Sequence, residues 1–481
     1  MSQLLEDVKS ALQTGNRDDI VKSLKAVGDL ARTEEGRSEL KAQDGVVESF
    51  RPFLADQSPF DDEITQWTAR AVGNLCYEDS ALSTQFSEIN AVNRFISLLN
   101  SQHEVARRNA AGALNNLASD NEGVSSNIVK LGGLPLFVRL LSCTDELTVN
   151  LTSKAIINVL RNGDHLEDLK SAGGFEAFSR LSRGNYHGEY LNLINIIVDN
   201  GVVDAQRIKL LNQDMVDALL YTVREAADEE EDDAEERSTA WETINTLSEK
   251  DDGKPLFTTL NIYNDLFSIV ERESERKEEA KKAYRALSNA SLEELNIQKF
   301  VEKYDLLIQQ ADHPEIEISM GSLMVLGNLA RSEEQCIKMA DDETLLSKLT
   351  ATTSHSDVRI SHLSLGVYRN LAVPVQNKEK LVTHGIYDVV KPHLSKTESP
   401  NLHLQYVCVG IVKALISGGE SFLASFAQAG GLKPLISTAN GIGVKPEEDD
   451  DGNPKEKDPR VEYEAARVLV RYTDTGDVIR E

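Results

Sequence analysis

The chain has 481 residues, of which 40% are hydrophobic and only 6% aromatic, and its formal net charge is −28. A surface this negative repels the phosphates of nucleic acids and of anionic lipids, so neither is expected as a partner. The charge favours a basic partner, although the solubility of a large exposed surface accounts for it as well.

The four cysteines lie far apart and form no C-x-x-C pair; they are Cys76, Cys143, Cys336 and Cys408. This usage is typical of a reducing compartment rather than of a disulfide framework. Residues 1–10 lack the apolar core of a signal peptide, and no apolar run reaches transmembrane length. We therefore expect a cytoplasmic protein without direct membrane insertion, with the nucleus as the other reducing compartment open to it.

One short pattern recurs from the start of the chain to its end. It is a helical stretch that ends in Leu or Val, Gly or Asn, Asn, Leu and a small residue. Clear copies contain Asn74, Asn116, Asn328 and Asn370, and weaker copies are anchored at Asp29, Asn158, Asn195, Asn245, Asn289, Ala414 and Val468. Successive anchors are about 44 residues apart on average, within the range of roughly 40–47 residues for HEAT and armadillo repeats.

A glycine joint follows many of these anchors. It is a Gly or Gly-Gly before an apolar segment, at Gly45, Gly132, Gly173, Gly385 and Gly430. Such a Gly ends one short helix in a left-handed conformation, and Pro135 and Pro434 then fit the first turn of the next helix. Three helices joined in this way fit armadillo units better than two-helix HEAT units. We therefore predict an all-α fold, a right-handed superhelical solenoid of about eleven armadillo-type repeats that spans residues 1–481 as a single unit.

Two acidic stretches interrupt the rhythm, at residues 225–237 and 445–459. Both are too polar to pack in a core, so we predict loops between helices.

No sequence motif indicates chemical catalysis. The chain has no Walker loop, no G-x-S-x-G and no H-E-x-x-H, and its histidines are not clustered at metal-ligand spacing. We expect no enzyme chemistry, no metal and no cofactor, and interpret the chain as a binding protein.

The recurring asparagine is the one polar feature with a mechanism. The third helix of an armadillo unit lines the inner surface of the stack, so equivalent Asn residues such as Asn74 and Asn116 form a ladder. An amide side chain both donates and accepts, so it can bind the backbone of an extended partner segment. The alternative is that each Asn bonds only to a neighbouring helix end.

A generic armadillo scaffold is a second hypothesis, and a transport adaptor for basic segments is a third. Importin-α combines such an Asn ladder with a Trp four residues before the Asn in many repeats. Here only Trp241 precedes an Asn by four residues, at Asn245, and Trp67 lies seven residues before Asn74. Because most repeats lack a Trp that could pack against the side chain of a bound lysine, the adaptor hypothesis is disfavoured.

Two adjacent repeats, at 321–342 and 362–386, carry a closer resemblance. They contain VLGNLARSEE and VYRNLAVPVQNK, and the run 369–378 departs most from general armadillo sequences. Together with AVGNLCYED at 71–79, these segments resemble the SmgGDS family, armadillo-type stimulators of GDP dissociation from small GTPases.

The resemblance implies a partner and a role. Members bind Rho- and Ras-type GTPases that end in a polybasic, prenylated tail, act as chaperones of these GTPases, and in some cases promote guanine nucleotide exchange. The resemblance implies an acidic inner surface for the tail, an apolar pocket among the early repeats for the lipid, and contact of the middle-to-late repeats with the GTPase switch region. We expect a monomer that binds a GTPase in this way.

The resemblance also implies site residues. An Asn pair spaced by four belongs to the family's exchange surface; its first member matches Asn328, whereas the second position is Ser332. Arg331, Arg369 and Asn370 lie in the matching segments. With Asn74 and Asn116 of the ladder, these residues form the predicted partner-binding set.

Overall fold

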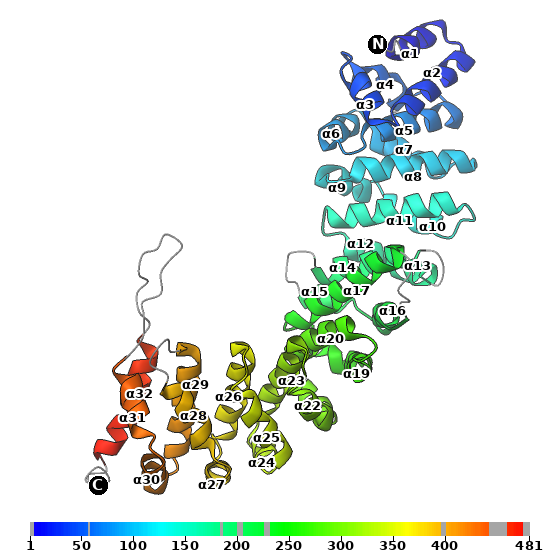
Figure 1. The fold of residues 1–481 in the computed structure, drawn as a ribbon. Coiled ribbons are helices and arrows are strands. Elements are labelled where there is room, and N and C mark those ends of the chain that lie inside the picture. The colour runs from blue at the N-terminus through cyan, green and yellow to red at the C-terminus, as the bar shows by residue number, and fades with distance from the viewer. Residues whose placement is uncertain are drawn as a thin grey trace. The chain divides into compact units, whose positions relative to one another are not determined.

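A computed structural model describes residues 4–55, 58–182, 186–199, 205–225, 231–395, 401–441 and 459–474. In these ranges the chain forms α-helices joined by short turns, and none of them contains a strand (Figure 1). The contacts divide the chain into two compact units, an N-terminal unit of Met1–Thr246 and a C-terminal unit of Leu247–Glu481. The all-α fold class is confirmed, while a single solenoid over residues 1–481 stays a prediction.

Every recurring anchor lies in a helix that we call the third helix of its repeat. In chain order the third helices are α2 (Arg17–Leu30), α5 (Asp62–Leu75), α8 (Glu104–Ala118), α11 (Glu146–Arg161), α14 (His187–Asp199), α17 (Glu231–Glu249), α20 (Lys277–Ala290), α23 (Ile316–Leu329), α26 (Val358–Leu371), α29 (Leu402–Ile416) and α32 (Arg460–Asp474). The described ranges thus hold eleven third helices, one for each predicted repeat.

Two shorter helices lie between successive third helices, and α1 (Leu4–Thr14) precedes the first of these. The short helices are α3 (Glu34–Lys41), α4 (Val46–Leu54), α6 (Ser80–Glu88), α7 (Ala91–Leu98), α9 (Glu122–Lys130), α10 (Gly133–Leu140), α12 (Leu166–Ser171), α13 (Gly174–Leu181), α15 (Ala205–Ile208), α16 (Gln213–Glu225), α18 (Leu256–Thr259), α19 (Ile262–Glu271), α21 (Glu294–Val301), α22 (Tyr304–Gln310), α24 (Glu333–Ala340), α25 (Glu343–Thr352), α27 (Val375–Thr383), α28 (Ile386–Leu394), α30 (Glu420–Gln428) and α31 (Leu432–Ala439).

In seven repeats the joint between the two short helices is a left-handed residue, as predicted for five of them. The glycines of the joint have φ angles between 71° and 93°, at Gly45, Gly132, Gly173, Gly385 and Gly430. Asn90 and Asn261 occupy the same place before α7 and α19, with φ of 76° and 58°. Asn tolerates this conformation better than most residues, so it can replace the glycine there. Before α22 and α25 the corresponding residues, Lys303 and Asp342, have negative φ angles.

The helix after the joint supplies an aromatic core residue. Phe50, Phe95, Phe137 and Phe178 each follow the left-handed residue by five positions and are fully buried. Burying such a side chain contributes on the order of 2–3 kcal/mol, so a thin repeat gains a core by stacking on its neighbours.

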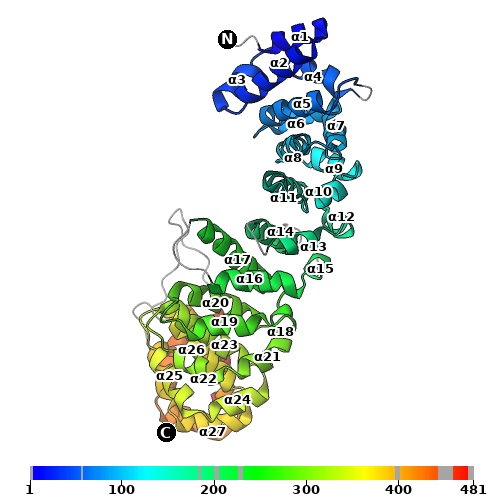
Figure 2. The same cartoon turned by 90° about the vertical axis from the view of Figure 1, so that its right-hand side faces the viewer.

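Third helices of adjacent repeats pack directly against each other. In the N-terminal unit α5, α8 and α11 lie side by side (Figure 1). Figure 2 shows α8 and α11 on one side of this stack and α9, α10 and α12 on the other. The approach is close, because a Cβ atom added at Gly73 would lie only 2.7 Å from Ala113 Cα. The third helices therefore form one face of each unit, which we call the third-helix face.

The prediction of a loop at 225–237 is wrong in part. Residues 226–230 lie outside the described residues, but α17 begins at Glu231 and includes 231–237. Acidic residues in the first turns of a helix are stabilised by its macrodipole, and Ala and Glu are good helix formers. The second predicted loop falls on residues 445–458, which lie outside the described residues; its last residue, Pro459, lies in a turn before α32.

Candidate partner-binding face

In the N-terminal unit the Asn ladder binds the neighbouring third helix. The Nδ2 atom of Asn74 on α5 donates to the Gly28 carbonyl on α2 at 2.8 Å. The Nδ2 atom of Asn116 on α8 donates to the Gly73 carbonyl at 2.9 Å. Each acceptor stands one position before the anchor of the preceding repeat, so the amide donors hold the third helices in register.

The C-terminal unit repeats the arrangement. Asn370 on α26 donates to the Gly327 carbonyl on α23 at 3.0 Å, and Asn328 donates to Ser291 Oγ at 2.8 Å and to the Ser288 carbonyl at 3.3 Å. The N–H groups of these Asn side chains thus bond to the neighbouring repeat, which was the alternative to binding a partner. The side-chain oxygens of Asn74, Asn328 and Asn370 accept no hydrogen bond within the described ranges. Asn328 is buried, whereas Asn74 and Asn370 are half-buried and keep an acceptor for the N–H of a partner.

Arg331 and Ser332 have different environments. Arg331 follows α23, is exposed, and makes no hydrogen bond or ion pair with any described residue. Ser332 lies beyond the end of α23 and is the N-cap of α24, where its side chain accepts from the Gln335 N–H at 3.1 Å. Ser332 therefore does not share a helix with Asn328, because α23 ends at Leu329 and the chain turns.

The most distinctive run of the sequence, 369–378, ends in two buried side chains that bond to other helices. The Nδ2 atom of Asn377 is buried and donates to the Cys336 and Leu371 carbonyls at 2.8 and 2.9 Å. Lys378 is only 1% exposed, and its Nζ donates to the Ala414 carbonyl and Ser417 Oγ, both at 2.5 Å. A cation at the C-terminal end of α29 is favoured by the helix dipole. These hydrogen bonds therefore hold α27 against three other helices.

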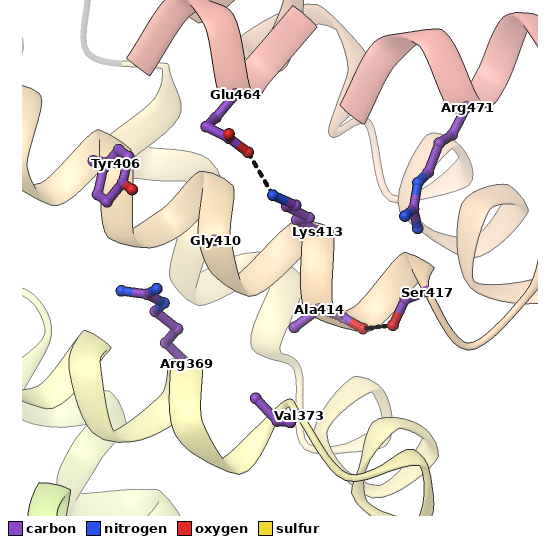
Figure 3. A pocket seen from close by; sticks show the side chains of 9 residues that line it. All are labelled: Arg369, Val373, Tyr406, Gly410, Lys413, Ala414, Ser417, Glu464 and Arg471. Carbon is purple, nitrogen blue, oxygen red and sulfur yellow. Dashed lines mark hydrogen bonds and ion pairs between the residues drawn. The ribbon is translucent and has the colours of Figure 1, made fainter. Parts of the chain in front are cut away.

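A pocket of about 400 Å³ lies on the third-helix face of the C-terminal unit. Its lining comes from α26, α29 and α32 and consists of Arg369, Val373, Tyr406, Gly410, Lys413, Ala414, Ser417, Glu464 and Arg471 (Figure 3). Of the predicted site residues, the structure places Arg369 here.

Arg369 is held across α29 by a glycine. A Cβ atom added at Gly410 would lie 3.2 Å from Arg369 Nε and 3.3 Å from its Cδ, so the small residue makes room for the arginine. Arg369 is exposed and makes no hydrogen bond or ion pair with any described residue. Its guanidinium donors are thus available to a ligand.

Charged groups around Arg369 influence one another. Lys413 and Glu464 form an ion pair at 2.6 Å, and this hydrogen bond lowers the pKa of Glu464 (Figure 3). Burial lowers the pKa of His362, and the charges of His403 and Arg369 lower it further. Burial, with a smaller contribution from Arg471, lowers the pKa of Lys378. Arg369 and Arg471 thus act as positive charges on the titratable groups beside them.

Sequence reasoning missed Tyr406, Lys413, Glu464 and Arg471. The available signal was the spacing of Tyr406, Gly410, Lys413 and Ser417, which places them on one side of α29. Together α26 and α29 carry Arg359, Arg369 and Lys413 and no Asp or Glu. An acidic inner surface is therefore not found on these two helices.

A second hollow, of about 640 Å³, lies between α20 and α23. Tyr284, Met320 and Met324 give it an apolar floor, and its charged rim consists of Glu249, Lys281, Lys282, Arg285, Glu317 and Arg359. A third cavity, of about 490 Å³ in the N-terminal unit, is lined mostly by polar residues, among them Arg108, Asp145 and Asn150. The apolar hollow thus lies in the middle repeats, whereas the resemblance implies an apolar pocket among the early ones.

Trp241 is 2% exposed and packs in the core, as expected of a tryptophan outside a ladder. The ring of Trp67 is covered by Lys25 Nζ at 4.5 Å and by the Arg70 guanidinium at 5.4 Å. Across the described ranges, no group of three or more His, Cys, Asp or Glu side chains is placed to hold a metal ion. None of the helices described is long and apolar enough to span a bilayer.

These features define an armadillo-type repeat protein whose third helices form one face of each unit. The Armadillo/beta-catenin-like repeat family matches residues 89–119. A solved structure from work on the phosphorylation switch that controls the interaction between cadherin and beta-catenin has a TM-score of 0.59. It is 15% identical and covers 98% of this chain and 93% of its own, which supports the armadillo fold.

The relatives by sequence point to a particular family. The Rap1 GTPase-GDP dissociation stimulator 1-A of Xenopus laevis is 22% identical over 370 residues, which cover 74% of this chain and 54% of the relative. Darlin of Dictyostelium discoideum is 23% identical over 518 residues, covering 86% of this chain and 66% of that protein. The chain thus spans about half the length of the GDP dissociation stimulators that it matches. The resemblance to the SmgGDS family seen in the sequence is confirmed.

Proposed function

We propose that this protein binds a small GTPase of the Rho or Ras type and stimulates the release of its GDP. The observation that carries the proposal is the similarity, over 74% of the chain, to proteins named as GDP dissociation stimulators of Rap1. The repeats and the third-helix face give this similarity a physical basis, because a stack of helices offers a long binding surface.

The chemistry required is modest. A protein that binds the nucleotide-free GTPase more tightly than the GDP-bound form accelerates GDP release without any covalent step. Such a protein needs exposed donors and acceptors on a rigid surface rather than a catalytic group. Arg331, just after α23, offers unused donors, and Asn370 on α26 offers an unused, partly exposed acceptor. We therefore assign the GTPase contact to α23 and α26.

The proposal extends to the tail of the GTPase. A polybasic tail is attracted by a protein of net charge −28, in a manner that salt weakens. The rim of the apolar hollow between α20 and α23 mixes Lys281, Lys282 and Arg285 with Glu249 and Glu317, so it offers such a tail no excess of negative charge. The tail is therefore expected on other parts of the chain, and a chaperone role requires that a lipid be buried there as well.

Release of labelled GDP tests the proposal. A panel of Rho-, Ras- and Rap-type GTPases, prenylated and unprenylated, is mixed with the protein and with Arg331→Glu and Asn328→Ala. We expect the wild type to accelerate release from at least one GTPase and Arg331→Glu to lose about tenfold of the effect, equivalent to about 1.4 kcal/mol. Lys433→Glu, an exposed change on α31, is the matched control and is expected to behave like the wild type.

The possible outcomes test the GDP release activity and the position of the GTPase contact separately. Unchanged release from every GTPase sinks the exchange activity, and the absence of any complex at low salt sinks GTPase binding as a whole. Acceleration that survives Arg331→Glu and Asn328→Ala would move the contact away from α23.

A further inference from the structure

The pocket between α26, α29 and α32 is cationic in a strongly acidic chain. Arg369, Lys413 and Arg471 line it, and Glu464 is its one carboxylate among the lining residues. Glu464 is already engaged by Lys413 at 2.6 Å. Because Lys413 and Glu464 balance each other, the charge of Arg369 makes the pocket positive, although the whole chain has a net charge of −28.

Arg369 supplies the principal donor. Its side chain is exposed, lies against Gly410 and has no hydrogen bond or ion pair with described residues. In Figure 3 its guanidinium lies between Tyr406 and Gly410, while Arg471 points into the pocket from α32. A guanidinium fixed at its base and free at its donors is suited to bidentate binding of a carboxylate.

A buried charge beneath the pocket adds to the field. Lys378 is 1% exposed and donates to the Ala414 carbonyl and to Ser417 Oγ, both from residues that line the pocket. No carboxylate forms an ion pair with Lys378 among the described residues. An uncompensated buried cation raises the potential above it far more than an exposed one, because the surrounding protein screens it weakly.

The surroundings of the cations suit a peptide. Tyr406 and Val373 flank the pocket and are 39% and 65% exposed, which provides apolar surface beside the charges. Asn370, the residue after Arg369, keeps its side-chain oxygen as an acceptor for a backbone N–H. A cavity of about 400 Å³ holds one or two side chains of an extended segment.

The net charge selects among anionic ligands. A long polyanion such as nucleic acid, or an anionic membrane, is repelled by the acidic surface around the pocket. A short acidic segment experiences mainly the charges within a Debye length, about 8 Å at physiological salt. We propose that this pocket binds an acidic peptide segment of a protein partner, with a carboxylate on Arg369. The proposal does not rest on GDP release, and its ligand is opposite in charge to a polybasic tail.

Peptide binding to the full chain tests the proposal without any GTPase. A labelled peptide in which Glu alternates with Gly is titrated by fluorescence anisotropy, beside a matched peptide with Gln in place of Glu. We expect the acidic peptide to bind at least about tenfold more tightly, and Arg369→Gln to remove about tenfold of its affinity. Lys433→Gln removes one positive charge from an exposed site on α31 outside the pocket and is expected to leave binding unchanged.

A second variant keeps the charge and changes only the geometry. Gly410→Ala places a methyl group against the Arg369 side chain and is expected to weaken acidic peptide binding while circular dichroism stays unchanged. Equal binding of both peptides, or full affinity in Arg369→Gln, would overturn the proposal. Sedimentation with phosphatidylserine vesicles that is lost in Arg369→Gln would overturn it in favour of a membrane ligand.

Discussion

Amide side chains fasten each repeat to the one before it. One Asn near the end of a third helix donates to the preceding third helix, as Asn116 does to Gly73. A second Asn in the following short helix donates both to its own repeat and to the preceding repeat. Asn296 bonds to the Ala290 and Lys254 carbonyls in this way, and Asn377 bonds to those of Leu371 and Cys336. The Ala290 and Leu371 carbonyls lie at the C-terminal ends of α20 and α26, so there the amides satisfy acceptors that the helices leave free.

The hydrogen bonds of Asn377 are expected to stabilise the fold by a measurable amount. Asn377→Ala removes two buried hydrogen bonds and leaves the Cys336 and Leu371 carbonyls without their donor, which costs on the order of 1–3 kcal/mol per unsatisfied group. We expect a lower midpoint of urea unfolding. Gln376→Ala changes the exposed neighbour and serves as the control, with no expected shift. A midpoint equal to that of the wild type would show that the two hydrogen bonds of Asn377 add no stability.

Local signals explain what the sequence predicted well at the residue scale. The positions of Asn74 and Asn370 follow from periodicity within one helix, and the left-handed residue at Gly132 follows from one turn. The pocket could not be found in this way. It needs Arg369 and Arg471 from helices about a hundred residues apart, and it needs Gly410 to make room for the arginine. The sequence did not show that Ser332 is the N-cap of α24, because this depends on where α23 ends, and helix ends are hard to place to within one turn.

At the element scale, glycine controls how closely third helices approach. Gly73 faces Ala113 across the contact between α5 and α8, and Gly321 faces the Tyr284 side chain across α20 and α23. Helical glycine costs stability within its own helix, yet it permits backbone contact between helices. The sequence pattern showed a small residue before the anchor Asn, but not which copies lie against a neighbour.

Matched glycine substitutions separate these two effects. Gly73→Ala puts a Cβ atom 2.7 Å from Ala113 Cα, so α5 or α8 must shift, and we expect a loss of roughly 1–3 kcal/mol in unfolding free energy. Gly366→Ala makes the same change in α26 where the Cβ atom meets nothing within 4 Å. That variant is expected to gain about 0.5–1 kcal/mol through its lower helix cost. Urea unfolding of both variants gives the comparison, and equal effects of the two substitutions would contradict the account of close packing.

At the scale of the whole molecule, the charge is unevenly distributed. The chain as a whole carries −28, whereas α26 and α29 contain no acidic residue. The composition gave the sign of the net charge and hence the expectation of a basic partner. It could not locate the positive face, because averages over 481 residues hide the few that share one side of two helices. The long-range field and the local field near Arg369 therefore have opposite signs.

Opposite fields predict two different salt dependences. A basic peptide is attracted at every distance, so its association rate with the protein should fall steadily as salt rises. The acidic peptide is repelled at long range and attracted inside the pocket. At about 0.01 M salt the Debye length is about 30 Å and repulsion by the whole chain dominates, whereas at about 0.15 M it is about 8 Å and the pocket cations dominate. The affinity for the acidic peptide should therefore pass through a maximum at intermediate salt and fall towards about 1 M. Stopped-flow and equilibrium titrations of both peptides over this range provide the measurement. An affinity for the acidic peptide that falls from the lowest salt onward would show that the pocket, and not the net charge, governs the approach of the ligand.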